Sequence, residues 1–179
     1  DRAVDVDDAV TVIRYSKERL PDEINEVAHV GEGLGRVDVL RRAEGARVLV
    51  VGYGQFVGTA LSVAERLNDQ GVAATVVDPL WALPVSAELT SMASDFDVVL
   101  TLEDNLVEGG VGQRLRARLA DEGAAAKVLT FGIPQAFLAP GSRDEVLEEI
   151  GLTAAQVSMQ ALGVVLNDAE VEQHTESTR

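Results

Sequence analysis

The stretch Arg47–Gly54, RVLVVGYG, is the segment from which the fold class can be predicted. It is an almost unbroken apolar run that ends in glycines, and it lacks the alternation of apolar and polar residues found in strands with one face in water. A run of this kind is typical of a strand that is buried on both faces, as in a parallel sheet covered by helices. The stretch therefore predicts an α/β fold.

The sequence on the C-terminal side of this run alternates between helical and strand patterns. Apolar residues at helical spacing occupy residues 55–70 and stop at Gly71, and a second apolar run, 72–80, contains Pro79 near its end. Further strands are expected at 97–105 and 126–134, and further helices at 86–95, 110–122, 142–151 and 153–167. The alternation from Ala46 to Leu166 predicts an open, mostly parallel sheet in a three-layer arrangement.

The residues before and after this region follow different patterns. Ala9–Tyr15 is rich in β-branched residues and predicts an extra strand, which needs a sheet to join, so residues 1–20 are expected to end a preceding domain. Residues 21–45 contain proline and several glycines and predict a linker, with a short extended piece at Arg36–Leu40. The C-terminal domain is assigned to 46–166, and the polar tail 167–179 is expected to be disordered.

Composition and charge narrow the class of function. The formal net charge of −15 argues against nucleic acid and against anionic membrane surfaces as partners. The chain has no cysteine, and its two histidines, His29 and His174, are far apart, which disfavours a thiolate or histidine metal site and a catalytic triad. No apolar run approaches the roughly 20 residues of a membrane-spanning helix. These features predict a cytoplasmic protein without a catalytic, cofactor or metal site of its own.

The stretch Thr101–Gly123, TLEDNLVEGGVGQRLRARLADEG, has the order of a strand, a glycine-rich loop and a helix. It lacks the lysine of a phosphate-binding loop, and Glu103, Asp104 and Glu108 would repel a phosphate. Glu103 and Asp104 are adjacent on a strand, so they are expected on opposite faces and not as an acid–base pair. The acids are expected to be solvated or to lie at an interface, and the glycines to allow close packing.

Five motifs in order carry a resemblance to a known family: VLVVGYG, VVDPLWALPV, VLTLEDN with GGVG, FGIPQAF and GSRDEVLEEIGLT, spanning Val48–Thr153. They resemble the C-terminal domain of the 1-deoxy-D-xylulose-5-phosphate synthase family, whose members are transketolase-like, thiamine diphosphate-dependent enzymes. Upstream, AVTVIRYSKE resembles the last strand of the family's middle, pyrimidine-binding domain. The resemblance implies a sheet of the transketolase C-terminal type.

The resemblance also implies an activity for the whole enzyme. Members of the family condense pyruvate with glyceraldehyde 3-phosphate with loss of CO₂, a step toward isoprenoid precursors, thiamine and pyridoxal. They use thiamine diphosphate and Mg²⁺, which are held by N-terminal and middle domains whose motifs cannot be placed on this sequence. The implied role is therefore that of a segment that binds no cofactor and is inactive alone. Its implied partners are those two domains and a second copy in a homodimer.

The resemblance implies roles for two groups of residues. Lys17 falls on the basic position that helps bind the substrate phosphate, and Arg14 is the neighbouring candidate, although Ser16 and Glu18 depart from the Pro and Gly of the family pattern. An interface with the other domains or a second subunit is expected at Glu103, Asp104, Gly109, Gly110 and Gly112.

Two other interpretations are open on the sequence. The chain could be the equivalent domain of a transketolase or of a 2-oxoacid dehydrogenase β subunit, although the ending GSRDEVLEEIGLT favours the synthase. It could also be a free-standing binding or oligomerisation module with a flavodoxin-like core. The strand predicted at Ala9–Tyr15 argues against the module, because a self-contained domain has no use for an unpaired strand.

Overall fold

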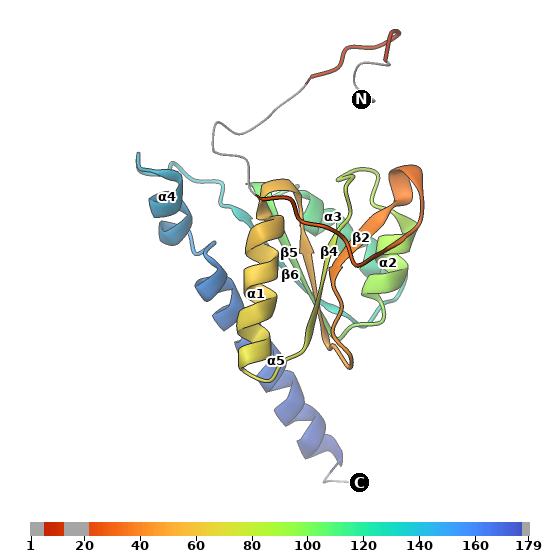
Figure 1. Cartoon of the computed structure of the whole chain (residues 1–179). Coiled ribbons are helices and arrows are strands. Elements are labelled where there is room, and N and C mark those ends of the chain that lie inside the picture. The colour runs from red at the N-terminus through yellow and green to blue at the C-terminus, as the bar shows by residue number, and fades with distance from the viewer. Residues whose placement is uncertain (1–5, 13–21, 177–179) are drawn as a thin grey trace.

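The computed structural model describes residues 6–12 and 22–176, and shows a twisted sheet between two layers of helices (Figure 1). The sheet has six strands in the order β1-β2-β4-β3-β5-β6. The strands are β1 (Ala28–Val30), β2 (Val37–Arg41), β3 (Val48–Gly52), β4 (Ala74–Asp78), β5 (Val98–Leu106) and β6 (Lys127–Ile133). The last four are parallel, and β1 and β2 are antiparallel to their neighbours. The predicted mostly parallel α/β sheet is confirmed.

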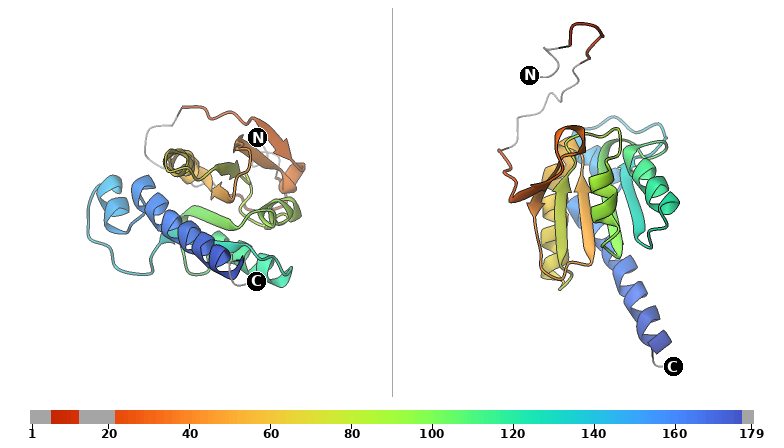
Figure 2. Two further views of the ribbon diagram at one scale, coloured as in Figure 1. Left: turned by 90° about the horizontal axis from the view of Figure 1, so that it is seen from below. Right: turned by 90° about the vertical axis from the view of Figure 1, so that its right-hand side faces the viewer.

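The helices cover both faces of the sheet (Figure 2). They are α1 (Val57–Asp69), α2 (Ala87–Ala93), α3 (Val111–Asp121), α4 (Arg143–Glu149) and α5 (Ala154–Glu176), with short 3₁₀ turns at Gly33–Gly35 and Gly54–Phe56. Helices α1 and α5 pack in one core with Val48 and Val50, whereas α2 and α3 pack in a second core with Leu49 and Val51. Residues 48–51 are fully buried, as expected for a strand with helices on both sides.

The helix N-termini begin at the predicted capping residues. The Ser86 hydroxyl accepts a hydrogen bond from the Leu89 amide at 3.0 Å, which caps α2. Ser142 and Glu145 form a reciprocal capping box at the start of α4. Thr153 caps α5, where its hydroxyl accepts from the Gln156 amide at 3.3 Å. The capping residues in the sequence therefore predicted the starts of these three helices correctly.

The interpretation of 21–45 as a linker is wrong for much of its length. Residues 28–41 form β1 and β2, which extend the sheet beyond β4. Val37 and Val39 are fully buried in the core beside α2, so this segment has a sheet to join. Gly31 and Gly33 adopt positive φ angles of 70° and 59° in the connection between the two strands. The glycines that suggested a linker thus form a turn within the sheet.

The two ends also differ from the predicted boundaries. Helix α5 continues to Glu176, so the expected disordered tail is helical from 167 to 176. No proline or glycine interrupts NDAEVEQHTE, and a helix that is already formed extends readily through such residues. Residues 9–12 have irregular backbone and form no strand, and 13–15 lie outside the described residues.

Candidate functional site at the carboxyl edge of the sheet

The carboxyl edge of the parallel strands contains a topological switch point. The chain leaves β3 through α1 to reach β4, and then crosses back through α2 to reach β5 on the other side of β3. In open α/β sheets, ligands bind beyond the strand ends at such a point. A functional site is therefore expected at the ends of β3 and β5.

The position between β5 and α3 is filled by the carboxylate of Glu103. Its two oxygens accept hydrogen bonds from the amides of Val111 and Gly112, each at 2.9 Å. The residue is only 2% exposed. A carboxylate at a helix N-terminus satisfies free amides and interacts favourably with the helix dipole. The chain's own anion thus occupies the position that a bound phosphate or diphosphate would need, and the expectation of a solvated acid is wrong for Glu103.

The glycines after β5 make this arrangement possible. A Cβ atom on Gly110 would lie 2.5 Å from Oε1 of Glu103, and one on Gly112 would overlap Oγ1 of Thr101. These glycines allow close packing between β5 and α3 of the same chain, and the packing against other domains stays a prediction. Glu103, Gly110 and Gly112 are buried within the chain, whereas Asp104 and Gly109 reach the surface; the interface expected at these five residues stays a prediction.

Asp104 points to the opposite side of β5, as predicted for neighbouring residues on a strand. Its carboxylate pairs with the guanidinium of Arg143 at the start of α4, with Oδ2 3.2 Å from Nη1. The guanidinium also lies 5.6 Å from the centre of the Phe56 ring. These contacts tie the β6–α4 connection to the strand ends. Sequence reasoning missed Arg143, since its partner is 39 residues away and only a helix-capping signal marked the region.

Tyr53 lies at the end of β3, within the switch point. Its hydroxyl is buried and makes no hydrogen bond among the described residues. Burial raises the pKa of this phenol above its ordinary value, and the negative charges of Glu103 and Asp78 raise it further. The phenol is therefore neutral at physiological pH and unsuited to act as a base. Two side chains of the chain itself, Tyr53 and Glu103, thus lie at the switch point.

Burial raises the pKa of Asp78, at the end of β4, above its ordinary value. The charge of Asp38, which lies opposite Asp78 on β2, raises this pKa further. A raised pKa means that the folded protein favours the protonated acid, so ionisation weakens the fold as the pH rises through the folded-state pKa. The structure holds one oxygen of Asp78 at 2.9 Å from the Leu80 amide, and an asparagine carbonyl could accept the same bond.

We expect Asp78→Asn to raise the free energy of unfolding at pH 7 by about 0.5 kcal/mol, after allowance for solvent screening of a half-buried group. The gain should shrink as the pH falls through the acid range, because Asp78 itself becomes neutral there. Urea unfolding at neutral and acid pH measures the difference. Glu44→Gln, on an exposed loop, is the matched control for loss of one negative charge. A gain that does not depend on pH would contradict the assignment.

One cluster in the described residues has the composition of a cation site. Ligand atoms of Glu26, His29 and Asp38 lie within 4.8 Å of one another. The guanidinium of Arg36 already bridges the two carboxylates, with Nε 2.6 Å from Asp38 and Nη2 2.9 Å from Glu26. Because this cation neutralises both acids, the cluster does not fit the Mg²⁺ of a thiamine diphosphate enzyme.

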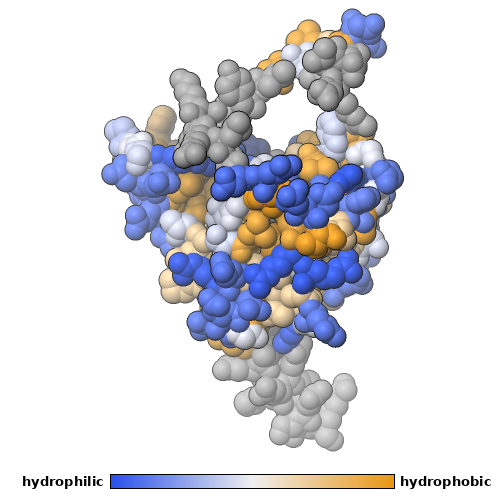
Figure 3. Space-filling view, viewed as in Figure 1, coloured by the Kyte–Doolittle hydropathy of each residue, from blue (hydrophilic) through white to orange (hydrophobic). Residues whose placement is uncertain are grey.

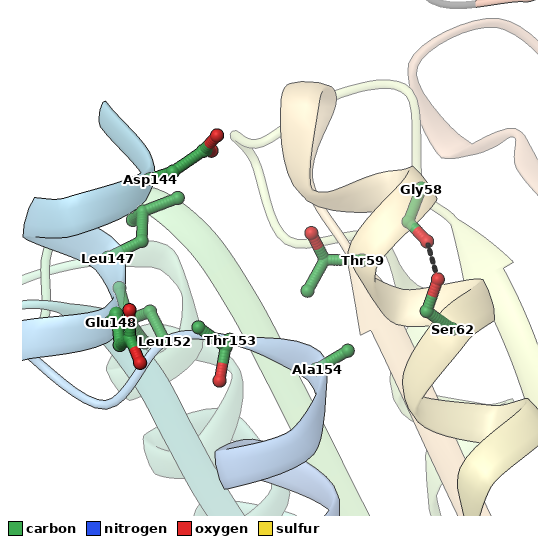
Figure 4. A pocket seen from close by; sticks show the side chains of 9 residues that line it. All are labelled: Gly58, Thr59, Ser62, Asp144, Leu147, Glu148, Leu152, Thr153 and Ala154. Carbon is green, nitrogen blue, oxygen red and sulfur yellow. Dashed lines mark hydrogen bonds between the residues drawn. The ribbon is translucent and has the colours of Figure 1, made fainter. Parts of the chain in front are cut away.

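A cavity of about 410 Å³ lies between α1 and the α4–α5 connection (Figure 4). Two of its hydroxyl groups are engaged locally: Ser62 donates to the Gly58 carbonyl at 3.2 Å, and Thr153 donates to the Gln156 side chain at 2.6 Å. Its two acids, Asp144 and Glu148, are exposed to solvent. The cavity is a surface cleft of mixed polar and apolar lining, and these hydrogen bonds do not pair a nucleophile with a base.

Lys17 and Arg14, the two residues assigned to substrate phosphate, lie outside the described residues. Their assignment rests on the sequence resemblance.

Comparisons with known proteins show the relationships of the chain. Residues 35–157 match the family model of the transketolase C-terminal domain. The chain is 42% identical to 1-deoxy-D-xylulose-5-phosphate synthase of Rhodococcus jostii over 164 residues, which are 91% of this chain and 25% of the relative. It is 39% identical to the synthase of Mycobacterium avium over 181 residues, which are 96% of this chain and 28% of the relative. The chain thus spans about a quarter of the length of these relatives.

Solved structures agree on the fold. A split-gene transketolase, described as an inactive β4 tetramer, superposes with a TM-score of 0.63 at 31% identity, over 73% of this chain and 42% of that one. A transketolase variant from Pichia stipitis gives a TM-score of 0.55 at 22% identity, over 73% of this chain and 18% of that one, which supports the fold alone. On the match to the family model and the identity to the synthases, the chain belongs to the transketolase C-terminal domain family.

Proposed function

We propose that the chain is the C-terminal segment of a 1-deoxy-D-xylulose-5-phosphate synthase and serves its packing and assembly without taking part in the chemistry. The whole enzyme would condense pyruvate with glyceraldehyde 3-phosphate with loss of CO₂, using thiamine diphosphate and Mg²⁺ bound by its other domains. The observation that carries the proposal is the identity of about 40% to such synthases over more than nine-tenths of the chain.

The geometry of the carboxyl edge supports the assembly role. At the switch point, Glu103 caps α3 from within the chain and Tyr53 is a buried neutral phenol. At an edge where enzymes of this architecture bind ligands, the Glu103 carboxylate instead joins β5 to the start of α3. The split-gene transketolase that superposes on the chain is described as inactive in its β4 form, which is consistent with a segment that needs other domains.

Exposed apolar side chains supply the surface for such domains. Phe137, in the β6–α4 connection, is fully exposed, and Leu80, Leu83 and Leu106 at the same edge are 43–51% exposed. A space-filling view shows further apolar surface between hydrophilic side chains on the side of β1 and β2 (Figure 3), where Val27 is 66% exposed. Large exposed apolar side chains gathered at one edge are a surface that partner domains commonly cover. We infer that the remaining domains of the enzyme cover the carboxyl edge.

A chimeric enzyme tests the proposal. The chain would replace the corresponding region of the Rhodococcus jostii synthase, and the product formed from pyruvate and glyceraldehyde 3-phosphate would be measured. We expect an active, dimeric chimera, no activity from the same synthase truncated before this region, and no thiamine diphosphate binding to the isolated chain by calorimetry. A folded chimera that is inactive, or micromolar binding of the cofactor to the isolated chain, would overturn the proposal.

Two variants of the chimera refine it. Phe137→Ser should weaken assembly in the chimera and leave the unfolding of the isolated chain unchanged, because the ring makes no buried contact there.

Lys17→Ala should raise the KM for glyceraldehyde 3-phosphate and leave the KM for pyruvate unchanged, since Lys17 is proposed to bind the substrate phosphate.

A further inference from the structure

The connection from β4 to α2 begins with a turn that carries large apolar side chains outside the core of the domain. Leu80 is 51%, Trp81 is 37% and Leu83 is 48% exposed. The two cores of the described domain include none of these three side chains, and the connection first contributes to a core at Val85. Residues 79–83, here named the Leu80 turn, therefore place apolar groups where the chain alone gains little from them.

The backbone of the Leu80 turn is strained. Leu80 has a φ angle of 50°, and among the residues that the structure describes every other positive φ belongs to a glycine. The Trp81 amide donates to the Pro79 carbonyl across Leu80, and such a three-residue turn with a positive φ at its centre is the rare, strained form of the γ-turn. A branched side chain is unfavourable at this position, whereas glycine adopts it freely. Glycine would thus suit the turn better than leucine.

Neighbouring groups hold the strained turn in place. Asp78, the last residue of β4, accepts a hydrogen bond from the Leu80 amide at 2.9 Å, and the ring of Pro79 fixes the φ angle of the residue between them. Strained backbone of this kind is concentrated at ligand clamps, switch regions and active sites, where it orders a group before that group is used. Two features thus coincide at Leu80: an unfavourable conformation and a side chain that the fold itself does not use.

The Leu80 turn lies at the end of the molecule from which the polypeptide arrives. Figures 1 and 2 show that residues 22–27 start at the carboxyl edge of the sheet and lead to β1, and that the connection from β4 to α2 lies at the same edge. The chain covers only 25% of the Rhodococcus jostii synthase. In an enzyme of that length, a domain that precedes residue 22 would be attached at the edge that carries the Leu80 turn.

We propose that Leu80 anchors this preceding domain by inserting its side chain into an apolar pocket there, and that Asp78 positions Leu80 for the insertion. The proposal rests on the proposed function, since it takes the chain as a segment of a longer enzyme. A turn that is fixed in its binding conformation beforehand loses little conformational entropy when the contact forms. Leu80 is therefore expected to contribute more to the contact than the other exposed apolar residues of this edge.

Urea unfolding of the isolated chain tests the strain. Leu80→Ala and Leu80→Gly both remove the apolar side chain, but only glycine relieves the positive φ. The unfolding equilibrium constant of Leu80→Gly should therefore be about threefold lower than that of Leu80→Ala. At Gln160, on the exposed side of α5, the same two substitutions are the control and should give the reverse order, because glycine weakens a helix. A glycine variant less stable than the alanine variant at position 80 would overturn the proposal.

Hydrogen exchange in the chimeric enzyme tests the contact. The backbone amides of 80–83 should exchange at least about tenfold more slowly in the chimera than in the isolated chain, because the preceding domain covers them. Leu80→Glu should remove this protection, since a carboxylate is excluded from an apolar pocket. Leu166→Glu is the matched control and should leave the protection unchanged: Leu166 is 57% exposed in the C-terminal half of α5, which Figure 1 shows away from the carboxyl edge.

Two variants of Asp78 test its positioning role. Asp78→Asn keeps an oxygen that can accept from the Leu80 amide, so the protection of 80–83 in the chimera should stay within about twofold of the wild type. Asp78→Ala removes the acceptor and should reduce the protection at least about fivefold, the effect of one lost hydrogen bond. If the asparagine variant were as damaging as the alanine variant, the charge of Asp78 would matter in place of its hydrogen bond, and the positioning role would be wrong.

The chimera also keeps the two proposals apart. Residues 80–83 that exchange equally fast in the isolated chain and in an active chimera would overturn the Leu80 contact and leave the proposed function standing. A folded but inactive chimera in which Leu80→Glu removes the protection of 80–83 would overturn the proposed function and leave the contact. Protection that appears in the isolated chain as its concentration rises would assign the turn to a second copy, and would overturn the contact with the preceding domain as well.

Discussion

Replacing Gly112 by alanine should lower the free energy of unfolding by roughly 3 kcal/mol, at the upper end of the cost of overpacking a core. The added Cβ would overlap Oγ1 of Thr101 and would lie 3.1 Å from both the Thr101 Cβ and the Thr130 Cγ2. Thr101 is on β5 and Thr130 is on its neighbour, the edge strand β6, so α3 would have to move away from the sheet. That movement would also stretch the bond from the Gly112 amide to Glu103. Urea unfolding of the isolated chain measures the loss.

Two further variants make the test specific. Gly58→Ala in α1 is the control, because a Cβ there meets no atom within 4 Å, and it should leave stability unchanged or slightly raised. Thr101→Ala removes the atom that Gly112→Ala would overlap, so the double variant should lose at least about 1 kcal/mol less than the sum of the single losses. Strictly additive losses would mean that the contact between these residues is not the cause.

The parts of the fold that follow from local patterns could be predicted from the sequence. The buried run Val48–Val51 indicated a sheet covered on both faces, and Ser142 with Glu145 marked the start of α4. The extended piece predicted at Arg36–Leu40 coincides with β2, but β1 and the membership of both strands in the sheet could not be recognised, since the signal is short and the glycines around it are equally typical of a linker. What makes Val37–Arg41 a strand is the free edge of β4, which is a property of the assembled sheet.

The candidate site was predictable only in part. Adjacent positions on a strand placed Glu103 and Asp104 on opposite faces, and the contacts confirm this. The partner of each acid depends on tertiary packing: Glu103 meets the amides at the start of α3, and Asp104 meets Arg143 from a distant helix. Because the two residues have the same charge and nearly the same sequence context, no local pattern could tell the buried carboxylate from the exposed one.

Substitution of these neighbouring acids should therefore have unequal effects. Glu103→Ala leaves two buried amides without an acceptor and creates a void, and should cost roughly 3 kcal/mol of unfolding free energy. Glu103→Gln keeps one carbonyl oxygen but turns an amide NH₂ toward the second N–H donor, and should cost about 1–2 kcal/mol. Asp104→Ala removes only a partly exposed ion pair, and should cost less than about 1 kcal/mol. Urea unfolding of the three variants gives the order.

The order of the three losses carries more information than any one of them. A solvated acid at position 103 would make Glu103→Ala no worse than Asp104→Ala, and equal losses would contradict the capping role. Measured in the chimera, Glu103→Gln should reduce the yield of folded enzyme and leave the kcat of the fraction that folds unchanged. A fall in kcat of correctly folded dimer would instead place this carboxylate in the chemistry, and the segment would then be more than a support for the other domains.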